Sequence, residues 1–289
     1  MLIKGLVYEN GEWIQKIAEY PDVIFDRLKL RGDSDANWIY EELSDIPFTN
    51  EWPVCLQSRS NIHEALSNIE ELSGILISLK EVERTRDIFS ALEISKKVFL
   101  KRNDWDLMGQ IHINQISQSK YIVTEKGKEI EYNGLQLLNK LREDLKEHRY
   151  ILHEDPRSTL NEQHFTLNTD IMLVEEQQWE LLTVYAREES GKIIKEEDLS
   201  SYLQSIIEEN SVENILTEME NLSNNVASSL RIALGDSVST LSMTFAVDDN
   251  NNLKLIEANP SGSNIIPDVQ ALSEGIIKRA NWLLKNEMK

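Results

Sequence analysis

Glu257 and Asn259 have the types and spacing best suited to chemistry. They stand two positions apart in the apolar run LKLIEAN at residues 253–259. In a strand, residues two apart point to the same face, so this spacing directs a carboxylate and an amide oxygen at one divalent cation. Mg²⁺ normally relies on several carboxylates together with phosphate oxygens. The pair therefore indicates a metal site with few protein ligands.

Lys101 is the second candidate, because it closes the apolar run Val98-Phe99-Leu100. A lysine at the end of a buried strand can point into a cleft and contact an anion such as phosphate. The alternative is a strand-end lysine that extends its amine into solvent. The residues alone leave both interpretations open.

Other catalytic motifs do not occur in the chain. It has neither the Gly-x-Gly-x-x-Gly pattern nor the Walker loop, in which glycines let backbone amides approach phosphate. It has no Gly-x-Ser-x-Gly elbow for a hydrolase. The five histidines, at positions 63, 112, 148, 153 and 164, show no paired metal-ligand spacing. Rossmann, P-loop, hydrolase and zinc-site functions are therefore not expected.

The composition is that of an acidic globular protein. The 289 residues include 30 Lys and Arg against 50 Asp and Glu, a formal charge of -20. Such a charge repels nucleic acid and anionic membranes, so neither is expected as a partner. The single cysteine, Cys55, and an N-terminus without a signal peptide predict a cytoplasmic protein.

Short strands and amphipathic helices are expected to position these residues. Asn10-Gly11 joins two alternating runs in a hairpin over residues 2–18, and residues 22–28 follow as a brief strand. Residues 61–92 have a helical pattern that starts after an N-cap at Ser60. Strands then follow at 98–101, 109–116 and 120–124, a helix at 135–148, and a second sheet at 150–154, 164–174 and 179–187. Helices at 196–209 and 212–234, a hairpin at 238–258 and a helix at 269–285 complete an α+β chain.

Several short segments resemble the endospore coat-associated ATP-grasp proteins, the YheC/YheD group. PDVIFDRL at residues 21–28 is similar to a Pro-Asp-Val-Val-Tyr-Asn-Arg strand of that group. VFLK at 98–101, followed by IHI at 111–113, resembles its lysine strand and glycine loop. LKLIEANP at 253–260 resembles Trp-Leu-Ile-Glu-Val-Asn-x-x-Pro, and the tract 150–187 resembles the hinge strand and its successors. The order of the segments, rather than any one of them, carries the resemblance.

The resemblance implies an ATP-grasp fold, in which two α/β lobes clasp a cleft after a short N-terminal α/β unit. It implies units at residues 1–58, 59–149 and 150–289. ATP and Mg²⁺ would be the cofactors, with Lys101, His153 and Glu154 on the nucleotide and Glu257 and Asn259 on the metal. Arg187 would be the catalytic arginine that meets the transferred phosphate.

Several positions depart from the pattern of that group. A gap-free alignment places Trp105, Met108 and Gln110 on its three loop glycines, and side chains of that bulk keep backbone amides away from triphosphate. Its Asp-x-Arg pair aligns with Thr166 and Asn168, and its second metal-binding acid with Thr244. Arg187 precedes two glutamates, so a surface arginine is an alternative there.

Three functions stay open at this point. The first is a divergent ATP-dependent carboxylate–amine ligase, with a nucleotide and a small carboxylate or peptide as ligands. The second, slightly favoured because the losses are independent, is a pseudo-ligase that acts as a binding or scaffold protein with a protein partner, for example in spore formation. The third is an acidic α+β binding protein of another family.

Overall fold

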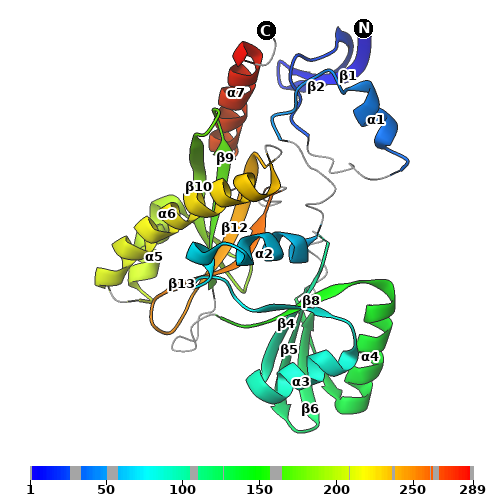
Figure 1. The fold of residues 1–289 in the computed structure, drawn as a ribbon, viewed down its shortest axis with the longest axis vertical. Coiled ribbons are helices and arrows are strands. Elements are labelled where there is room, and N and C mark those ends of the chain that lie inside the picture. Colours follow the sequence, from blue (N-terminus) through cyan, green and yellow to red (C-terminus); the bar gives the residue numbers. More distant parts are fainter. Residues whose placement is uncertain are drawn as a thin grey trace.

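The computed structural model describes residues 2–26, 34–50, 58–104, 110–125, 127–156, 165–207, 209–235, 238–260, 262 and 267–286. Within these residues the chain forms a two-stranded hairpin, a six-stranded sheet and a five-stranded sheet. Figure 1 shows the hairpin and the six-stranded sheet at opposite ends of the long axis. No helix in the described ranges combines the length and the hydropathy needed to cross a bilayer.

The N-terminal unit starts with the predicted hairpin, β1 (Leu2–Glu9) and β2 (Glu12–Glu19). Asn10 and Gly11 have φ angles of 53° and 88°, as a tight turn between twisted strands requires. The strand expected at 22–28 is reduced to one parallel bridge between Ile24 and Phe48. Its last two residues lie outside the described ranges. A short helix, α1 (Asn37–Glu42), follows.

The six-stranded antiparallel sheet has the order β3-β8-β4-β5-β6-β7. Its strands are β3 (Leu79–Val82), β4 (Lys97–Arg102), β5 (Gln110–Ser117), β6 (Lys120–Glu125), β7 (Lys128–Asn133) and β8 (Tyr150–Glu154). The helices α3 (Thr85–Ser95) and α4 (Gly134–Glu147) bury one face, where Leu92 and Leu137 pack against Leu100 and Ile113. The opposite face is left for the site.

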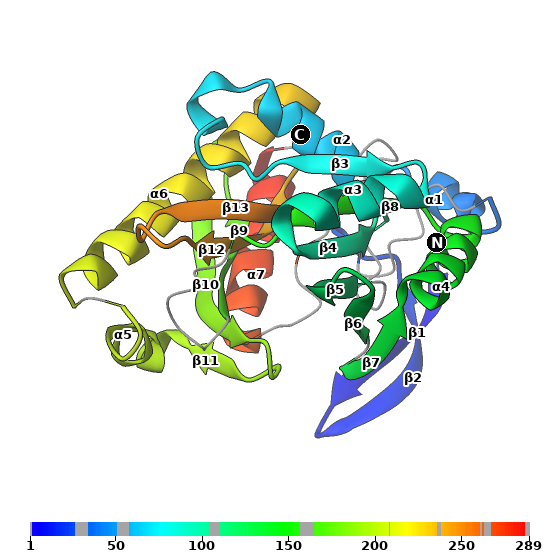
Figure 2. The same cartoon turned by 90° about the horizontal axis from the view of Figure 1, so that it is seen from below.

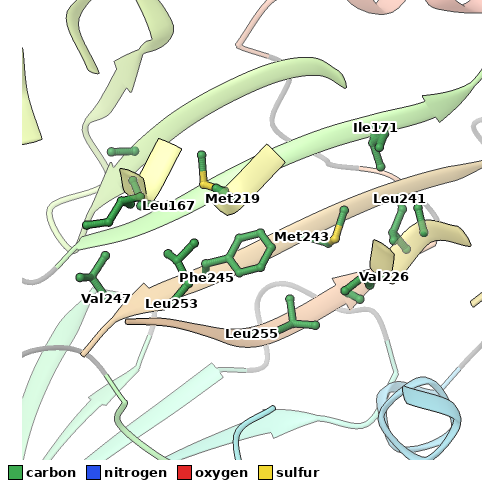
Figure 3. Packing of buried hydrophobic residues seen from close by; sticks show 14 of the residues in the cluster. Leu167, Ile171, Met219, Val226, Leu241, Met243, Phe245, Val247, Leu253 and Leu255 are labelled. Carbon is green, nitrogen blue, oxygen red and sulfur yellow. The ribbon is translucent and has the colours of Figure 1, made fainter. Parts of the chain in front are cut away.

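The five-stranded sheet has the order β11-β10-β9-β12-β13. Its strands are β9 (Phe165–Leu173), β10 (Trp179–Glu188), β11 (Ile193–Lys195), β12 (Thr240–Val247) and β13 (Leu253–Asn259). Alternate residues of β9, β12 and β13 meet Met219 and Val226 of the helix α6 (Glu209–Leu234), and Phe245 lies in the middle of this core (Figure 3). The helix α5 (Glu196–Gln204) covers the same face.

The C-terminal helix α7 (Val269–Asn286) lies on the other face of the five-stranded sheet. Its Gly275 faces the side chains of Leu182 and Met172. Figure 2 shows α6 and α7 on opposite sides of β10. Both faces of this sheet are therefore partly covered, and polar side chains are left at one end of the α7 face.

Two further expectations about the elements were wrong. Residues 61–92 do not form one helical stretch: α2 (Arg59–Ser67) and the short 3₁₀ turn at Glu70–Leu72 end before Gly74, and β3 follows. Leu76 bridges Leu255 of β13 and β3 pairs with β8, so pairing with distant strands overrides the helical pattern. Residues 150–154 belong to the first sheet, because β8 pairs with β4.

The short helix α2 packs on the core of the five-stranded sheet. Ile62 and Leu66 of α2, with Leu72 of the 3₁₀ turn, belong to the same buried cluster as Phe245 and Leu255. The backbone N–H of Leu255 also donates to the Ile75 carbonyl at 2.8 Å. The division of the chain at residues 58 and 149 stays a prediction.

Candidate functional site

A cavity of about 220 Å³ lies between the two sheets. The six-stranded sheet contributes Phe99, Lys101, Gln110, His112 and His153, and α2 contributes Arg59. The five-stranded sheet contributes Thr166, Asn168, Arg187, Thr244, Ile256 and Glu257. The expected cleft between facing sheets is therefore present, and it brings together residues that are far apart in the sequence.

Glu257 is held by two basic side chains at the inner end of this cavity. Lys101 Nζ lies 2.9 Å from Glu257 Oε2, and Arg59 Nη2 lies 3.4 Å from Oε1. The side chains of Lys101, Arg59 and Glu257 are 13%, 5% and 14% exposed. The predicted phosphate-binding lysine and the predicted metal-binding carboxylate thus bind each other across the cleft.

The charges determine the ionisation of Glu257. Burial alone raises the pKa of a carboxyl group, but the Lys101 ammonium and the Arg59 guanidinium outweigh it and lower the pKa of Glu257 from 4.5 to about 2. The carboxylate is therefore ionised at neutral pH. Its two oxygens are already occupied by cations.

Arg59 was not among the residues predicted from the sequence. Ser58, not Ser60, is the N-cap of α2, since its hydroxyl accepts from the Asn61 N–H at 3.1 Å. Arg59 therefore stands in the first turn, where the helix dipole disfavours a positive charge. Its Nη1 also donates to the Arg102 carbonyl at 2.7 Å. With the N-cap expected at Ser60, the sequence offered no signal that pointed to Arg59.

Asn103 connects the start of α2 to the end of β4. Its Oδ1 accepts from the Ser60 N–H at 3.0 Å, and its backbone carbonyl accepts from the Arg59 N–H at 2.8 Å. Its Nδ2 donates to Ser60 Oγ at 2.9 Å and to Glu81 Oε1 at 3.0 Å. This buried amide fixes the position from which Arg59 reaches Glu257.

The strands beside Glu257 carry neutral side chains that bind one another. Thr244 is the register partner of Glu257, and both line the cavity, as the alternation predicted. The Thr244 hydroxyl donates to Asn168 Oδ1 at 3.0 Å, and Asn168 Nδ2 contacts Thr166 Oγ1 at 3.2 Å. Asn259 is buried, and its amide donates to the Gly262 carbonyl at 3.3 Å.

These residues do not fit a magnesium ion. Glu257 is the one carboxylate on this face that the alignment assigns to a metal, and it carries two ion pairs. Thr244 offers a hydroxyl in place of an acid. Within the ranges that the structure describes, no group of three or more His, Cys, Asp or Glu side chains is placed to hold a metal ion.

A row of rings crosses the opposite wall of the cavity. His153, Phe99 and His112 are register partners on β8, β4 and β5. The rings of Phe99 and His153 are parallel to within 4°, with centroids 5.3 Å apart, and the His112 centroid lies 4.0 Å from that of Phe99. The His153 and Phe99 rings are therefore stacked, whereas the His112 ring is tilted by 64° against that of Phe99.

His153 is neutral in this wall. It is 3% exposed, and its burial, with the nearby Lys101 charge, lowers the pKa of the imidazole to about 3. Its Nδ1 lies 2.8 Å from the Glu154 carbonyl oxygen. A carbonyl only accepts hydrogen bonds, so Nδ1 carries the proton and Nε2 carries a lone pair.

The remaining predicted residues are placed less centrally. Arg187 lines the cavity on the five-stranded sheet and its side chain is exposed. Glu154 is exposed at the end of β8 and does not line the cavity. Gln110 lines the cavity, whereas Trp105 and Met108 lie outside the described residues.

Comparisons with known proteins agree with this geometry. Residues 45–280 match the family model described as YheC/D like ATP-grasp. Among curated protein sequences, none matches the chain significantly.

Solved structures of ligases share the fold at low sequence identity. The D-alanine-D-alanine ligase from Coxiella burnetii is 11% identical with a TM-score of 0.56, over 99% of this chain and 77% of that chain. VanG D-Ala:D-Ser ligase from Enterococcus faecalis is 15% identical with a TM-score of 0.53, over 98% and 79%. N5-carboxyaminoimidazole synthetase from Staphylococcus aureus, complexed with ADP, is 15% identical with a TM-score of 0.53. The match covers 84% of this chain but only 54% of the synthetase.

Proposed function

Because the chain belongs to the YheC/D-like ATP-grasp family, we propose that it is a binding protein that kept the two-lobed cleft and lost metal-dependent ligase chemistry. The fold resembles that of carboxylate–amine ligases such as D-alanine-D-alanine ligase. A shared fold does not carry a reaction, which depends on the residues of the site. The proposal therefore rests on the cleft residues of this chain.

The state of the Glu257 carboxylate carries the proposal. A ligase that uses ATP needs carboxylates free to hold Mg²⁺ on the phosphates. Here Lys101 and Arg59 bind both oxygens of Glu257, and Thr244 stands opposite it. The lysine that would contact phosphate and the acid that would bind metal neutralise each other.

A divergent carboxylate–amine ligase is the second candidate. Lys101, Arg187 and Glu257 all line one cavity, which is the minimum that transfer of a phosphoryl group to a carboxylate would use. This function requires ATP and Mg²⁺ to separate Lys101 and Arg59 from Glu257. Arg187 would then act on the phosphate, with Asn259 as a further metal ligand and His153 and Glu154 beside the nucleotide.

The remaining assignments are part of the proposal and follow from family and composition. We place the protein in the cytoplasm, with a protein partner and, by family resemblance, a role in spore formation. ATP with Mg²⁺ binds weakly or not at all. A strongly acidic chain with a formal charge of -20 is a poor binder of nucleic acid and of anionic membranes.

Thermal unfolding in the presence of millimolar ATP and Mg²⁺ tests the proposal. A ligand present at a hundred times its dissociation constant stabilises a protein by roughly 2.7 kcal/mol, which melting detects. We expect little stabilisation of the parent protein. The ligase function is correct instead if the parent shows a large shift that EDTA, Lys101→Ala and Glu257→Ala each abolish.

A further inference from the structure

The N-terminal hairpin presents one apolar face that is largely open to solvent. The register of β1 and β2 places Tyr8 opposite Trp13, and residues two apart in a strand share a face. The rings of Tyr8 and Trp13 lie on this face with their centroids 5.1 Å apart. Contiguous exposed apolar side chains mark interaction sites. The apolar face of the hairpin consists of five large side chains that are between 60% and 70% exposed: Leu2, Leu6, Tyr8, Trp13 and Ile17.

The opposite face of the hairpin is less apolar and less exposed. There Lys16 Nζ lies 2.6 Å from Glu9 Oε2 in an ion pair. Ile3 and Ile14 share that face and are 40% and 39% exposed. Gly5 adds no side chain to it. The apolar area that could dock a partner is therefore concentrated on one face.

The hairpin has no third strand among the residues that the structure describes. A two-stranded hairpin alone is marginally stable in water, and packing of an apolar face is what stabilises it. Figures 1 and 2 both show the hairpin at the periphery of the molecule. The described part of the chain leaves Leu2, Leu6 and Ile17 exposed, so packing on this face must come from outside the described residues.

The charge of the hairpin favours a second copy of the chain as the partner. Residues 2–19 carry two lysines and three glutamates, a net charge of -1, whereas the whole chain carries -20. On the apolar face, Lys4 and Glu19 balance each other. Two copies repel each other over the acidic remainder of their surfaces. A two-fold contact through this face avoids that repulsion and brings Lys4 of each copy to the surface that carries Glu19 of the other.

The area of the apolar face is enough for a dimer that exchanges with the monomer. Aromatic side chains offer roughly 150–250 Å² each, so five large side chains at this exposure offer about 500 Å² per copy. Two copies then bury about 1,000 Å², the lower bound for a specific interface. Interfaces of this size are weak, and a dissociation constant in the micromolar range is expected.

We propose that the chain forms a two-fold symmetric homodimer through the apolar face of its N-terminal hairpin. Leu6 and Ile17 lie in the middle of this face and form the centre of the contact. The hairpin residues are not among those that line the cavity between the larger sheets. The proposal therefore goes beyond the proposed function and depends on neither nucleotide nor metal.

Sedimentation velocity of the full chain over a range of micromolar concentrations tests the proposal. We expect the sedimentation coefficient to rise from the monomer value to the dimer value as the concentration increases. Added salt should strengthen the association, because it screens the repulsion between two acidic copies and leaves the apolar contact intact. A parent protein that stays monomeric, or a dimer that salt dissociates, would overturn the proposal.

Two double variants assign the contact to one face of the hairpin. Threonine keeps a high preference for strands while removing apolar area. Leu6→Thr with Ile17→Thr should weaken the dimer roughly 10- to 100-fold, since four side chains lose buried area in each dimer. Ile3→Thr with Ile14→Thr makes the matched change on the opposite face and should leave the dissociation constant within about threefold. Equal effects of the two double variants would contradict the proposed interface.

Hydrogen exchange on the parent protein provides a test that needs no variant. Docking stabilises the hairpin, so its backbone amides should exchange more slowly at high protein concentration than at low concentration. The amides of α4 serve as the internal control and should exchange at the same rate at both concentrations. Protection of α4 without protection of residues 2–19 would place the contact elsewhere and overturn the proposal.

Discussion

Glu257 has two cationic neighbours and little water. Removing a carboxylate from solvent is unfavourable, and here Lys101 at 2.9 Å and Arg59 at 3.4 Å offset that cost. Replacing such a group by a neutral one leaves the remaining charges buried without a counterion. The carboxylate is therefore expected to matter for stability even where it has no ligand to bind.

We expect Glu257→Gln to lower the free energy of unfolding by about 3 kcal/mol, the usual effect of breaking a buried ion pair. Urea denaturation at neutral pH measures it. Glu180→Gln is the matched control, because Glu180 pairs with Lys278 at the surface, where the side chains are 34% and 51% exposed. That change should stay below about 1 kcal/mol. Equal effects of the two substitutions would show that Glu257 is not held as described.

His153 should make the stability depend on pH. Its folded-state pKa is about 3 and its ordinary value is 6.5, so between these values the unfolded chain binds a proton that the folded protein does not. Stability is then complete above pH 6.5 and falls as the pH drops toward 3. The slope from one such group approaches about 1.4 kcal/mol per pH unit.

Urea denaturation at pH 7, 6 and 5 on the parent and on His153→Phe measures this contribution. The variant lacks the titrating group, so its stability should fall less over the interval. An unchanged slope would mean that another group causes the acid sensitivity. Glu257 contributes separately and lower, because its pKa is reduced from 4.5 to about 2 and its stabilisation is lost only between those values.

The sequence predicted part of the arrangement around Glu257. Alternation along two strands placed Thr244 and Glu257 together, and the structure pairs them. Lys101 was expected to meet a ligand, and its ammonium meets Glu257, 156 positions away. Arg59 is 198 positions from Glu257. No local pattern in the sequence contains a contact of that range, so it was missed.

Elements with local causes were predicted correctly. The turn at Asn10-Gly11 joins β1 to β2, and Asp248 Oδ1 accepts from the N–H groups of Asn250 and Asn252 at 2.9 Å each in the turn between β12 and β13. The helix expected at 135–148 is α4, and Asn133 caps it through a reciprocal bond with Gln136. In each case the residues that determine the geometry are neighbours in the chain.

Elements with distant partners were predicted less well. Residues 61–92 carry apolar residues at helical spacing, yet part of this segment forms β3 because β8 offers an open edge. The short strands β7 and β11 were not expected at all. The helical spacing of apolar residues in this segment carries no information about β8, which lies far along the chain and pairs with β3.

Asn103 links the start of α2 to the end of β4 through hydrogen bonds. We expect Asn103→Ala to lower the free energy of unfolding by about 2 kcal/mol, because it leaves the buried Ser60 N–H without its acceptor and removes two bonds from Nδ2. Asn225→Ala on the exposed side of α6 is the control and should change stability by less than about 0.5 kcal/mol. Guanidinium titration of both variants decides. A loss no larger than that of the control would show that Asn103 does not stabilise the contact between α2 and β4.

Ion pairs of Glu257 join the two sheets across the cleft. Lys101 comes from the six-stranded sheet and Glu257 from the five-stranded sheet. Arg59 comes from α2, which packs on the core of the five-stranded sheet. The ion pairs hold the two walls of the cleft against each other. Under the proposed function, the same contact would both occupy the Glu257 carboxylate and link the two walls of the cleft.

We expect that two substitutions beside Glu257 can create a cation site. Arg59→Met removes the guanidinium from Glu257, and Thr244→Asp adds a carboxylate directly opposite it. Two carboxylates on neighbouring strands resemble the oxygen donors that Mg²⁺ and Mn²⁺ prefer. We expect the double variant to bind Mn²⁺, which electron paramagnetic resonance detects as loss of the free-ion signal.

Thr244→Asp alone is the control, because the new carboxylate can pair with Arg59 and should bind little Mn²⁺. The double variant should also gain stability in millimolar Mg²⁺, since a ligand that binds only the folded state shifts unfolding. Urea denaturation with Mg²⁺ and with EDTA measures that gain. Equal Mn²⁺ binding by the parent and the double variant would mean that Arg59 does not block the site. Binding by the double variant alone would assign the loss of the metal site to Arg59 and Thr244, residues supplied by two distant parts of the fold.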